Sequence, residues 1–208
     1  MRTFIDLGTH FFEGLADFDA KLGINKSWNV YSYEGCRDLY EETQSIRASI
    51  ESKYNALHHF NNAVIDRNGT VIFNKIIHLK HIDSGKVTKD YFGAANCLEE
   101  EVTSDSGYSW VPEKEEVACV DINTILETIV SADPDAEIYI KADIEGSEFK
   151  VLPRLLASPH LPRVKEIYVE WHERFWASDP AEHARKCELK DALIRDFTAK
   201  GITMHDHH

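Results

Sequence analysis

The stretch YIKADIEGSEFKVL, residues 139–152, changes character near its middle. It begins as an apolar run of the kind that forms a buried strand, and it ends with apolar residues at helical spacing. Asp143, Glu145 and Gly146 lie between the two parts. In open α/β sheets, ligands bind beyond the carboxyl ends of the strands, where the strand order reverses. The stretch therefore predicts a strand, a turn and a helix, with its carboxylates at a binding edge.

Strand-like and helix-like segments alternate along the rest of the chain. Strands are predicted at 3–7, 28–34, within 56–65, at 136–143 and at 164–173, and a sixth could start at 201–204. Helices are predicted at 14–22, 36–53, 122–129, 147–157 and 180–199. Pro153 should kink the fourth helix or delay its start. Asn68 and Gly69 predict a turn into an added strand, which we expect to form a hairpin with the third strand. The alternation predicts an α/β fold with a mostly parallel sheet and helices on both faces.

Residues 78–118 interrupt this regular order with polar and glycine-containing segments such as DSGK, GAANC and SDSGYSW. A loop of that length inside a compact domain usually has a function or is mobile. We therefore expect one domain over residues 1–208, with 78–118 as a long insertion or lid over the site.

The composition excludes several classes of protein. The chain of 208 residues is 43% hydrophobic and 28% charged, as is usual for a globular domain. No apolar run is long enough for a membrane-spanning helix, and the first residues read as a core strand. The net charge of −13 argues against nonspecific binding to nucleic acids and favours a cationic, neutral or sugar ligand. Four widely spaced cysteines indicate reduced thiols and predict a cytoplasmic protein: Cys36, Cys97, Cys119 and Cys187. The tail HDHH reads as a frayed terminus, with a metal site as the alternative.

The first two predicted strands end in acidic residues and glycines. Asp6 precedes Gly8, which allows a tight turn, although a helix-capping turn would explain the pair equally well. Glu34 ends the second strand, where a carboxylate can bind both hydroxyls of a ribose, unless it is a surface residue before a turn. Neither the dinucleotide fingerprint GxGxxG nor the phosphate-binding loop GxxxxGK[ST] is present.

The fourth and fifth strands end in a group of titratable residues. If these strands are neighbours, their ends bring four side chains to one cleft: Asp143, Glu145, Glu170 and His172. The carboxylates would raise the basicity of the histidine. Lys141 shares a strand face with Asp143, so a purely structural ion-paired cluster is the alternative. No spacing such as HExxH indicates a metal site, although a hard cation on the acidic group remains a second possibility.

Six segments together resemble the FkbM family of S-adenosylmethionine-dependent methyltransferases. They follow the family's order over residues 4–173: FIDLGTH, VYSYEG, NNAVIDRNGTVIFN, VDINTIL, YIKADIEGSEFKVL and IYVEWHE. The most specific segment is IKADIEGSEFKVL, which is similar to the family's KIDVEGxExxVL. The resemblance implies a Rossmann-like class I methyltransferase fold. It also implies O-methylation of a hydroxyl on a sugar, a glycan or a small natural product, with S-adenosylmethionine as cofactor.

The resemblance assigns roles to residues that match the family's motifs. It places Asp6 and Gly8 at the cofactor's methionine end and Glu34 at its ribose. Asn62 and Ala63 would lie near the adenine. The acidic motif would face the methyl-transfer centre and the cofactor, together with the end of the fifth strand: Asp143, Glu145, Gly146, Glu170 and His172.

The chain also departs from the family's pattern. The first motif usually reads DxGANxG, but Thr9 and His10 replace Ala-Asn, and Phe12 replaces the last glycine. We expect Phe12 to narrow or rearrange this loop. The final antiparallel strand pair is expected to be incomplete, because the sequence ends just after GITM.

An alcohol needs to lose a proton before it attacks a sulfonium methyl group, so the site requires a base. Asp143 and His172 are the predicted bases, with Glu145 and Glu170 as supporting carboxylates. Two other functions stay open. The chain could be a different nucleotide-binding Rossmann enzyme, or an inactive binding module that retains the fold.

Overall fold

The computed structural model describes residues 1–81, 87–96 and 110–207. Its strands are β1 (Arg2–Leu7), β2 (Trp28–Tyr33), β3 (Ala56–Phe60), β4 (Ala63–Ile65), β5 (Gly69–His81), β6 (Val87–Asn96), β7 (Trp110–Asp121), β8 (Glu137–Ala142), β9 (Val164–Val169) and β10 (Thr203–Asp206). Its α-helices are α1 (Glu13–Leu22), α2 (Arg37–Glu42), α3 (Gln44–Ile50), α4 (Ile122–Ala132), α5 (Glu148–Leu156) and α6 (Pro180–Ala199). Three short 3-10 helices, η1 (Glu51–Lys53), η2 (Leu161–Arg163) and η3 (Glu173–Trp176), complete the set.

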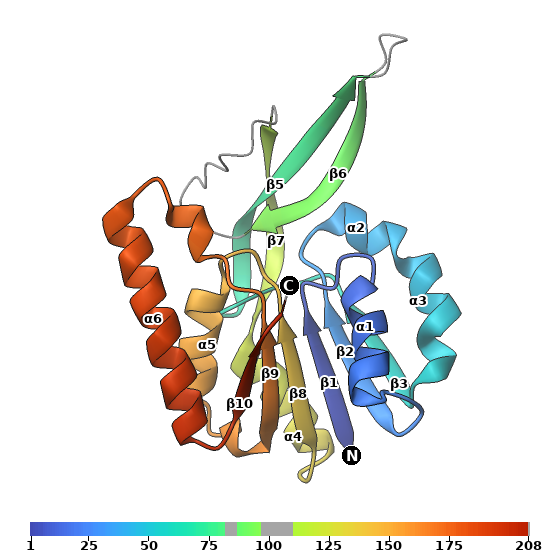
Figure 1. The fold of residues 1–208 in the computed structure, drawn as a ribbon. Coiled ribbons are helices and arrows are strands. Elements are labelled where there is room, and N and C mark those ends of the chain that lie inside the picture. Colours follow the sequence, from blue (N-terminus) through green and yellow to red (C-terminus); the bar gives the residue numbers. More distant parts are fainter. Residues whose placement is uncertain (82–86, 97–109, 208) are drawn as a thin grey trace.

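The central sheet has six strands in the order β10-β9-β8-β1-β2-β3, and all of its pairings are parallel (Figure 1). The predicted α/β fold is therefore confirmed. The strand order reverses between β1 and β8, which makes their carboxyl ends the expected binding edge. The strand expected near residue 201 begins at Thr203, and it lies parallel to β9 rather than in an antiparallel pair.

Helices cover both faces of this sheet. On one face, α4, α5 and α6 bury an apolar cluster that includes Leu126, Leu152 and Phe197. On the other face, α1 buries Leu15 and Phe18, and α3 packs two partly buried isoleucines against the same cluster. Full burial of a side chain of this size stabilises the fold by about 1.5–3 kcal/mol. Pro153 lies inside α5, which nevertheless runs continuously from Glu148 to Leu156.

The second sheet corrects two predictions. Its order is β4-β7-β5-β6, and β5 pairs antiparallel with β7 and β6. The expected hairpin between β5 and the third strand is therefore wrong. Much of the supposed loop at 78–118 is also strand, since β6 and most of β7 lie in it. In β7, Val117 and Cys119 alternate inward against Val71 and Phe73 of β5, a period-two pattern that the neighbouring Lys and Glu residues obscured.

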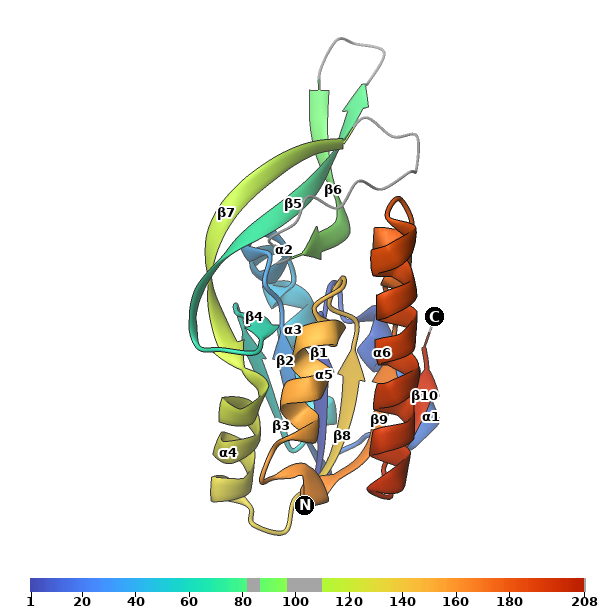
Figure 2. The same ribbon diagram turned by 90° about the vertical axis from the view of Figure 1, so that its left-hand side faces the viewer.

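The second sheet rises beyond the carboxyl edge of the parallel sheet (Figure 1), and β5 and β7 curve together in the side view (Figure 2). Residues 82–86 and 97–109 lie outside the described part of the chain, so the lid role of 78–118 stays a prediction. Among the described residues, no helix combines the length and the apolar character that a membrane crossing requires.

Gly8 allows the loop after β1 to touch the end of β8. Its φ of +78° lies in the left-handed region, and a Cβ atom on it would lie 1.8 Å from the backbone oxygen of Asp143. No side-chain rotation can relieve a clash with backbone. Gly23, which caps the end of α1, has a similar φ of +65° but no described atom within 4 Å of an added Cβ.

These two glycines allow backbone strain to be separated from steric contact. Gly23→Ala should lower the free energy of unfolding by about 1–2 kcal/mol, the cost of a left-handed conformation. Gly8→Ala should lower the free energy of unfolding by about 1–3 kcal/mol more than Gly23→Ala. The additional loss arises because the carboxyl ends of β1 and β8 must also move apart. Urea denaturation of both variants measures the difference. Equal losses of stability in the two variants would show that the loop after β1 does not contact the end of β8 as described.

Candidate active site

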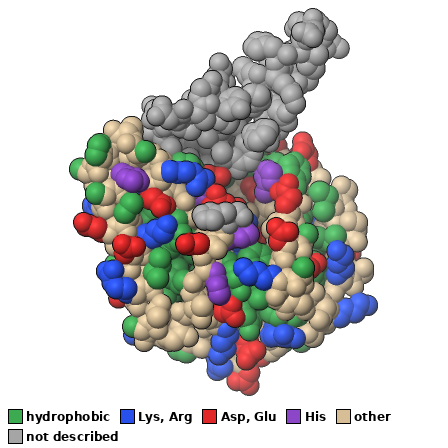
Figure 3. Space-filling model, in the orientation of Figure 1, with side chains coloured by type: hydrophobic (Ala, Val, Ile, Leu, Met, Phe, Trp, Pro, Cys, Tyr) green, Lys and Arg blue, Asp and Glu red, His purple; other side chains and the backbone are tan. Residues whose placement is uncertain are grey.

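A cavity of about 340 Å³ opens at the carboxyl edge of the parallel sheet. Most of the predicted site residues line it: Gly8, Glu34, Asn62, Ala63, Asp143, Glu145 and Glu170. Asp6 and His172 are not among its described lining residues, and both are fully buried. Figure 3, in the orientation of Figure 1, shows Asp, Glu and His side chains close together near the middle of the view. The predicted residues therefore lie close together, but Asp6 and His172 are buried behind the residues that line the cavity.

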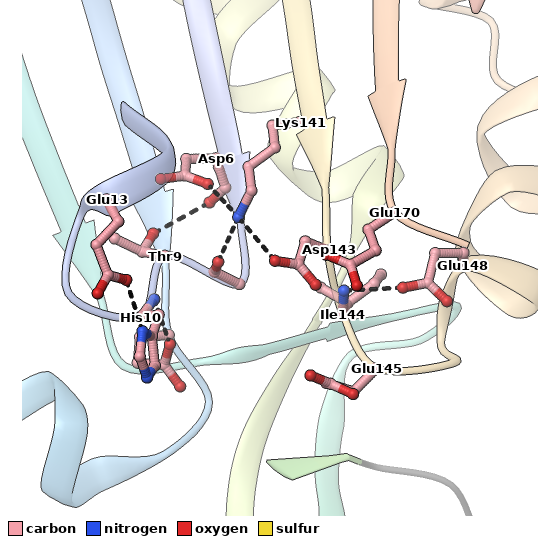
Figure 4. A network of polar contacts seen from close by, with 12 residues as sticks. Asp6, Thr9, His10, Glu13, Lys141, Asp143, Ile144, Glu145, Glu148 and Glu170 are labelled. Carbon is pink, nitrogen blue, oxygen red and sulfur yellow. Dashed lines mark hydrogen bonds and ion pairs between the residues drawn. The ribbon is translucent and has the colours of Figure 1, made fainter. Parts of the chain in front are cut away.

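Lys141 lines the cavity and joins the ends of β1 and β8 (Figure 4). Its Nζ donates to the backbone oxygen of Gly8 at 2.7 Å and lies 3.3 Å from Asp6 Oδ1 and 3.4 Å from Asp143 Oδ2. Burial alone would lower the pKa of Lys141, but the charges of Asp6 and Asp143 raise it above its usual value. The group therefore stays an ammonium ion. Asp6 stabilises the charge of Lys141 through this ion pair and is not among the residues that line the cavity.

Glu34 follows the last residue of β2 and is held by the backbone. Its Oε2 accepts from the N–H of His10 at 2.9 Å, and its Oε1 accepts from the N–H of Cys36 at 2.8 Å. Burial raises the pKa of Glu34, and these backbone hydrogen bonds oppose that effect. An ionised carboxylate has about four acceptor positions, so it can still bind further hydroxyls. The prediction that an acidic side chain stands at this strand end agrees with the geometry.

Part of the cavity lining is apolar and includes Ala63, Val64 and Phe73. Phe73 comes from β5, and sequence reasoning missed it because that strand was expected to pair elsewhere. A Cβ atom on Gly35 would lie 2.8 Å from the Phe73 ring, so this glycine lets the second sheet close over the strand end.

His172 lies at the centre of the acidic group. Its Nδ1 forms a 3.1 Å hydrogen bond with Glu148 Oε1. Its Nε2 lies 3.4 Å from Glu145 Oε2, 3.6 Å from Glu170 Oε1 and 3.8 Å from Asp143 Oδ1. Burial by itself would lower the pKa of His172, but Glu148 and the other carboxylates raise it to about 9. In this arrangement the imidazole is a cation at neutral pH. That state disfavours the predicted role of His172 as a base that titrates near pH 6–7.

Glu145 occupies a strained position at the wall of the cavity. It has a φ of 51°, a left-handed conformation that is uncommon for residues other than glycine. Burial raises its pKa to about 7, with His172 opposing the shift and the neighbouring carboxylates adding to it. Backbone strain of this kind is found most often at functional sites.

Comparison with known proteins agrees with this geometry. Residues 6–193 match the model of the methyltransferase FkbM domain. The chain belongs to the FkbM methyltransferase family.

A solved structure, methyltransferase FkbM from Methylobacillus flagellatus KT, shares the fold with a TM-score of 0.51 and 11% sequence identity. The alignment covers 94% of this chain and 38% of that one, so the chain spans well under half of the solved relative. A search of curated proteins found no match.

Membership in the FkbM family identifies a residue that sequence reasoning overlooked. Glu148 matches the second glutamate of the family's EGxE motif, and it is fully buried in the first turn of α5. Its Oε1 accepts from the N–H of Ile144 at 2.8 Å as well as binding His172. The strand-end pattern marks only residues that follow a strand, whereas Glu148 reaches the site from a helix.

Phe12 replaces a glycine of the FkbM motif without entering the cavity. It has a φ of 64°, which explains why a glycine suits this position. Its side chain is buried beneath α1, with its ring centroid 4.9 Å from that of His59. Phe12 is not among the described lining residues, so the expectation that it narrows or rearranges the loop stays a prediction.

The described part of the C-terminal tail, residues 205–207, packs against the end of β9, contrary to the prediction of a frayed end. The His205 Nε2 lies 2.9 Å from Glu166 Oε2, and its ring stacks on Tyr168 with centroids 4.5 Å apart. The N–H of His207 donates to the oxygen of Val169 at 2.9 Å, and His207 lines the cavity. Pairing of β10 with β9 brings the tail to this edge.

The titration of His172 tests the described network. In metal-free protein, its imidazole should titrate near pH 9 by NMR, and Glu148→Gln should lower this pKa because the hydrogen-bonded anion is lost. Since the folded-state pKa exceeds the unfolded value, the contribution of His172 to stability is complete below about pH 6.5 and is lost as the pH rises toward 9. A midpoint between pH 6 and 7 in the unaltered protein would contradict the network.

Proposed function

We propose that the chain is an S-adenosylmethionine-dependent methyltransferase that O-methylates a hydroxyl on a sugar, a glycan or a small natural product. One observation carries the proposal: an acidic cavity at the point where the strand order reverses, with Glu34 at the end of β2 and carboxylates at the ends of β8 and β9. Family membership supports methyl transfer, and the cavity supports the cofactor and the class of nucleophile.

The lining of the cavity fits the parts of this cofactor. Glu34 has acceptor positions for ribose hydroxyls, which an acidic residue at this strand end can bind together. Ala63, Val64 and Phe73 offer an apolar surface to an aromatic base. The carboxylates at the other end, with Asp143 among them, match a cationic sulfonium and an ammonium group.

The bound cofactor supplies a methyl group on a positively charged sulfur, and an alcohol that receives this group needs to lose its proton. Two carboxylates that line the cavity could accept that proton, Asp143 and Glu145. Lys141 Nζ lies 3.4 Å from one oxygen of Asp143 and orients this carboxylate. Glu145 lines the cavity at a largely desolvated position. We therefore assign the role of base to Glu145 and an orienting role to Asp143.

Binding of S-adenosylhomocysteine tests the role of Glu34. Glu34→Gln keeps the size of the side chain but removes its charge and one acceptor oxygen. It should weaken binding by about 1–3 kcal/mol in calorimetry, the usual loss for a hydrogen bond to a charged group. Glu41→Gln makes the same change at an exposed position on α2 and should leave the affinity unaltered. Equal affinities of the two variants would remove Glu34 from the cofactor site.

Turnover tests the assignment of the base. Release of S-adenosylhomocysteine, screened over hydroxylated sugars and glycosides, identifies an acceptor. On that acceptor, Glu145→Gln should lower kcat by about 10²-fold or more with little change in cofactor affinity, because only proton transfer is lost. Asp143→Asn should lower turnover and cofactor affinity together. If both variants keep full activity, the carboxylates have only a structural role.

A further inference from the structure

His172 presents a buried nitrogen to the acidic group without a hydrogen bond. Its side chain is 0% exposed, and Nε2 has no hydrogen-bond partner among the described residues. This nitrogen lies near the carboxylates of Asp143 and Glu170, which come from the ends of β8 and β9.

The spacing of these three groups suits a metal ion. Nε2 lies 3.8 Å from Asp143 Oδ1 and 3.6 Å from Glu170 Oε1, and one ligand atom from each residue lies within 4.8 Å of the others. Ligands about 2.0–2.2 Å from a common cation are separated by about 3–4 Å from one another. A cation could therefore bind between them with small side-chain movements.

Glu148 supplies the support that a metal-binding histidine requires. Its Oε1 accepts from Nδ1 of His172 at 3.1 Å, which fixes the ring and leaves Nε2 as the atom that faces the carboxylates. A carboxylate that accepts from the other ring nitrogen is one of the common partners of a metal-bound histidine. Glu148 is itself held by the N–H of Ile144.

The surrounding charges favour a cation more strongly than a neutral ligand. Glu145 adds a fourth carboxylate next to His172, with its Oε2 at 3.4 Å from Nε2. Lys141 contacts the other oxygen of Asp143, so Oδ1 keeps its lone pairs. Arg174 donates to Glu170 Oε1 at 3.1 Å, and a bound cation would replace this contact with a side chain that is 57% exposed.

We propose that Asp143, Glu170 and His172 form a binding site for one divalent cation at the edge of the cavity. One imidazole with two carboxylates suits Mn²⁺ and related transition metals better than Ca²⁺ or Mg²⁺, which prefer oxygen ligands alone. Three protein ligands leave coordination positions open, as in catalytic metal sites. Asp143 and Glu170 also line the cavity, so these positions face the place where an acceptor would bind.

In the proposed methyl transfer, this cation would activate the acceptor. A metal ion that binds the acceptor's hydroxyl would lower the pKa of that hydroxyl and help Glu145 to remove its proton. This role rests on the proposed methyl transfer, whereas cation binding does not.

Mn²⁺ binding tests the site without cofactor or acceptor. Titration of the chelator-treated protein, followed by the electron paramagnetic resonance signal of free Mn²⁺, should show one bound ion per chain. Glu148→Gln should weaken binding by about 10–100-fold, the usual effect of removing the partner behind a metal-bound histidine. Glu170→Gln, which removes a ligand charge at a partly exposed position, should weaken it at least as much.

Two control variants separate this site from other carboxylates and histidines. Glu127→Gln, at an exposed position of α4, and His205→Gln, in the tail HDHH, should bind Mn²⁺ like the unaltered chain. The proposal is overturned if the free-ion signal persists in excess protein. It is also overturned if His205→Gln abolishes binding while Glu170→Gln and Glu148→Gln keep it. Because S-adenosylhomocysteine binding is measured separately, a negative result here leaves the proposed function standing.

Discussion

The buried ammonium group of Lys141 is the interaction on which the site depends. It joins Asp6, the backbone of Gly8 and Asp143, and so ties the ends of β1 and β8 together at the point where the strand order reverses. Burying a charge is costly unless it is paired, and breaking one partner of such a pair typically costs about 3–5 kcal/mol. The first motif and the acidic motif are therefore held as one unit.

Asp143 connects this unit to a second charged group. One of its oxygens faces Lys141, and the other faces His172, which Glu148 supports from α5. The same carboxylate thus belongs to a structural ion pair and to the group that lines the cavity. Substitution of Asp143 alone cannot separate these two roles, so Glu145, Glu148 and Glu170 are the more informative positions.

The sequence was sufficient to predict the parallel sheet and most of the site, because apolar runs that end in Asp6, Glu34, Asp143 and Glu170 mark the carboxyl edge. It could not show which side chains reach the cavity and which lie beneath it, since that depends on packing between strands. The second sheet was missed because charged residues interrupt the alternation in β7. Glu148 and Phe73 were missed because they reach the site from a helix and from that second sheet.

The central claim is that the acidic cavity binds S-adenosylmethionine, and thermal unfolding with different ligands tests it most directly. Ligands that bind only the folded state raise the unfolding temperature, by an amount that grows with the logarithm of their concentration above Kd. The account predicts that S-adenosylmethionine and S-adenosylhomocysteine stabilise the protein, whereas NAD and ATP do not. Stabilisation by NAD or ATP, with no effect of the two sulfur compounds, would contradict it and indicate a different nucleotide-binding enzyme.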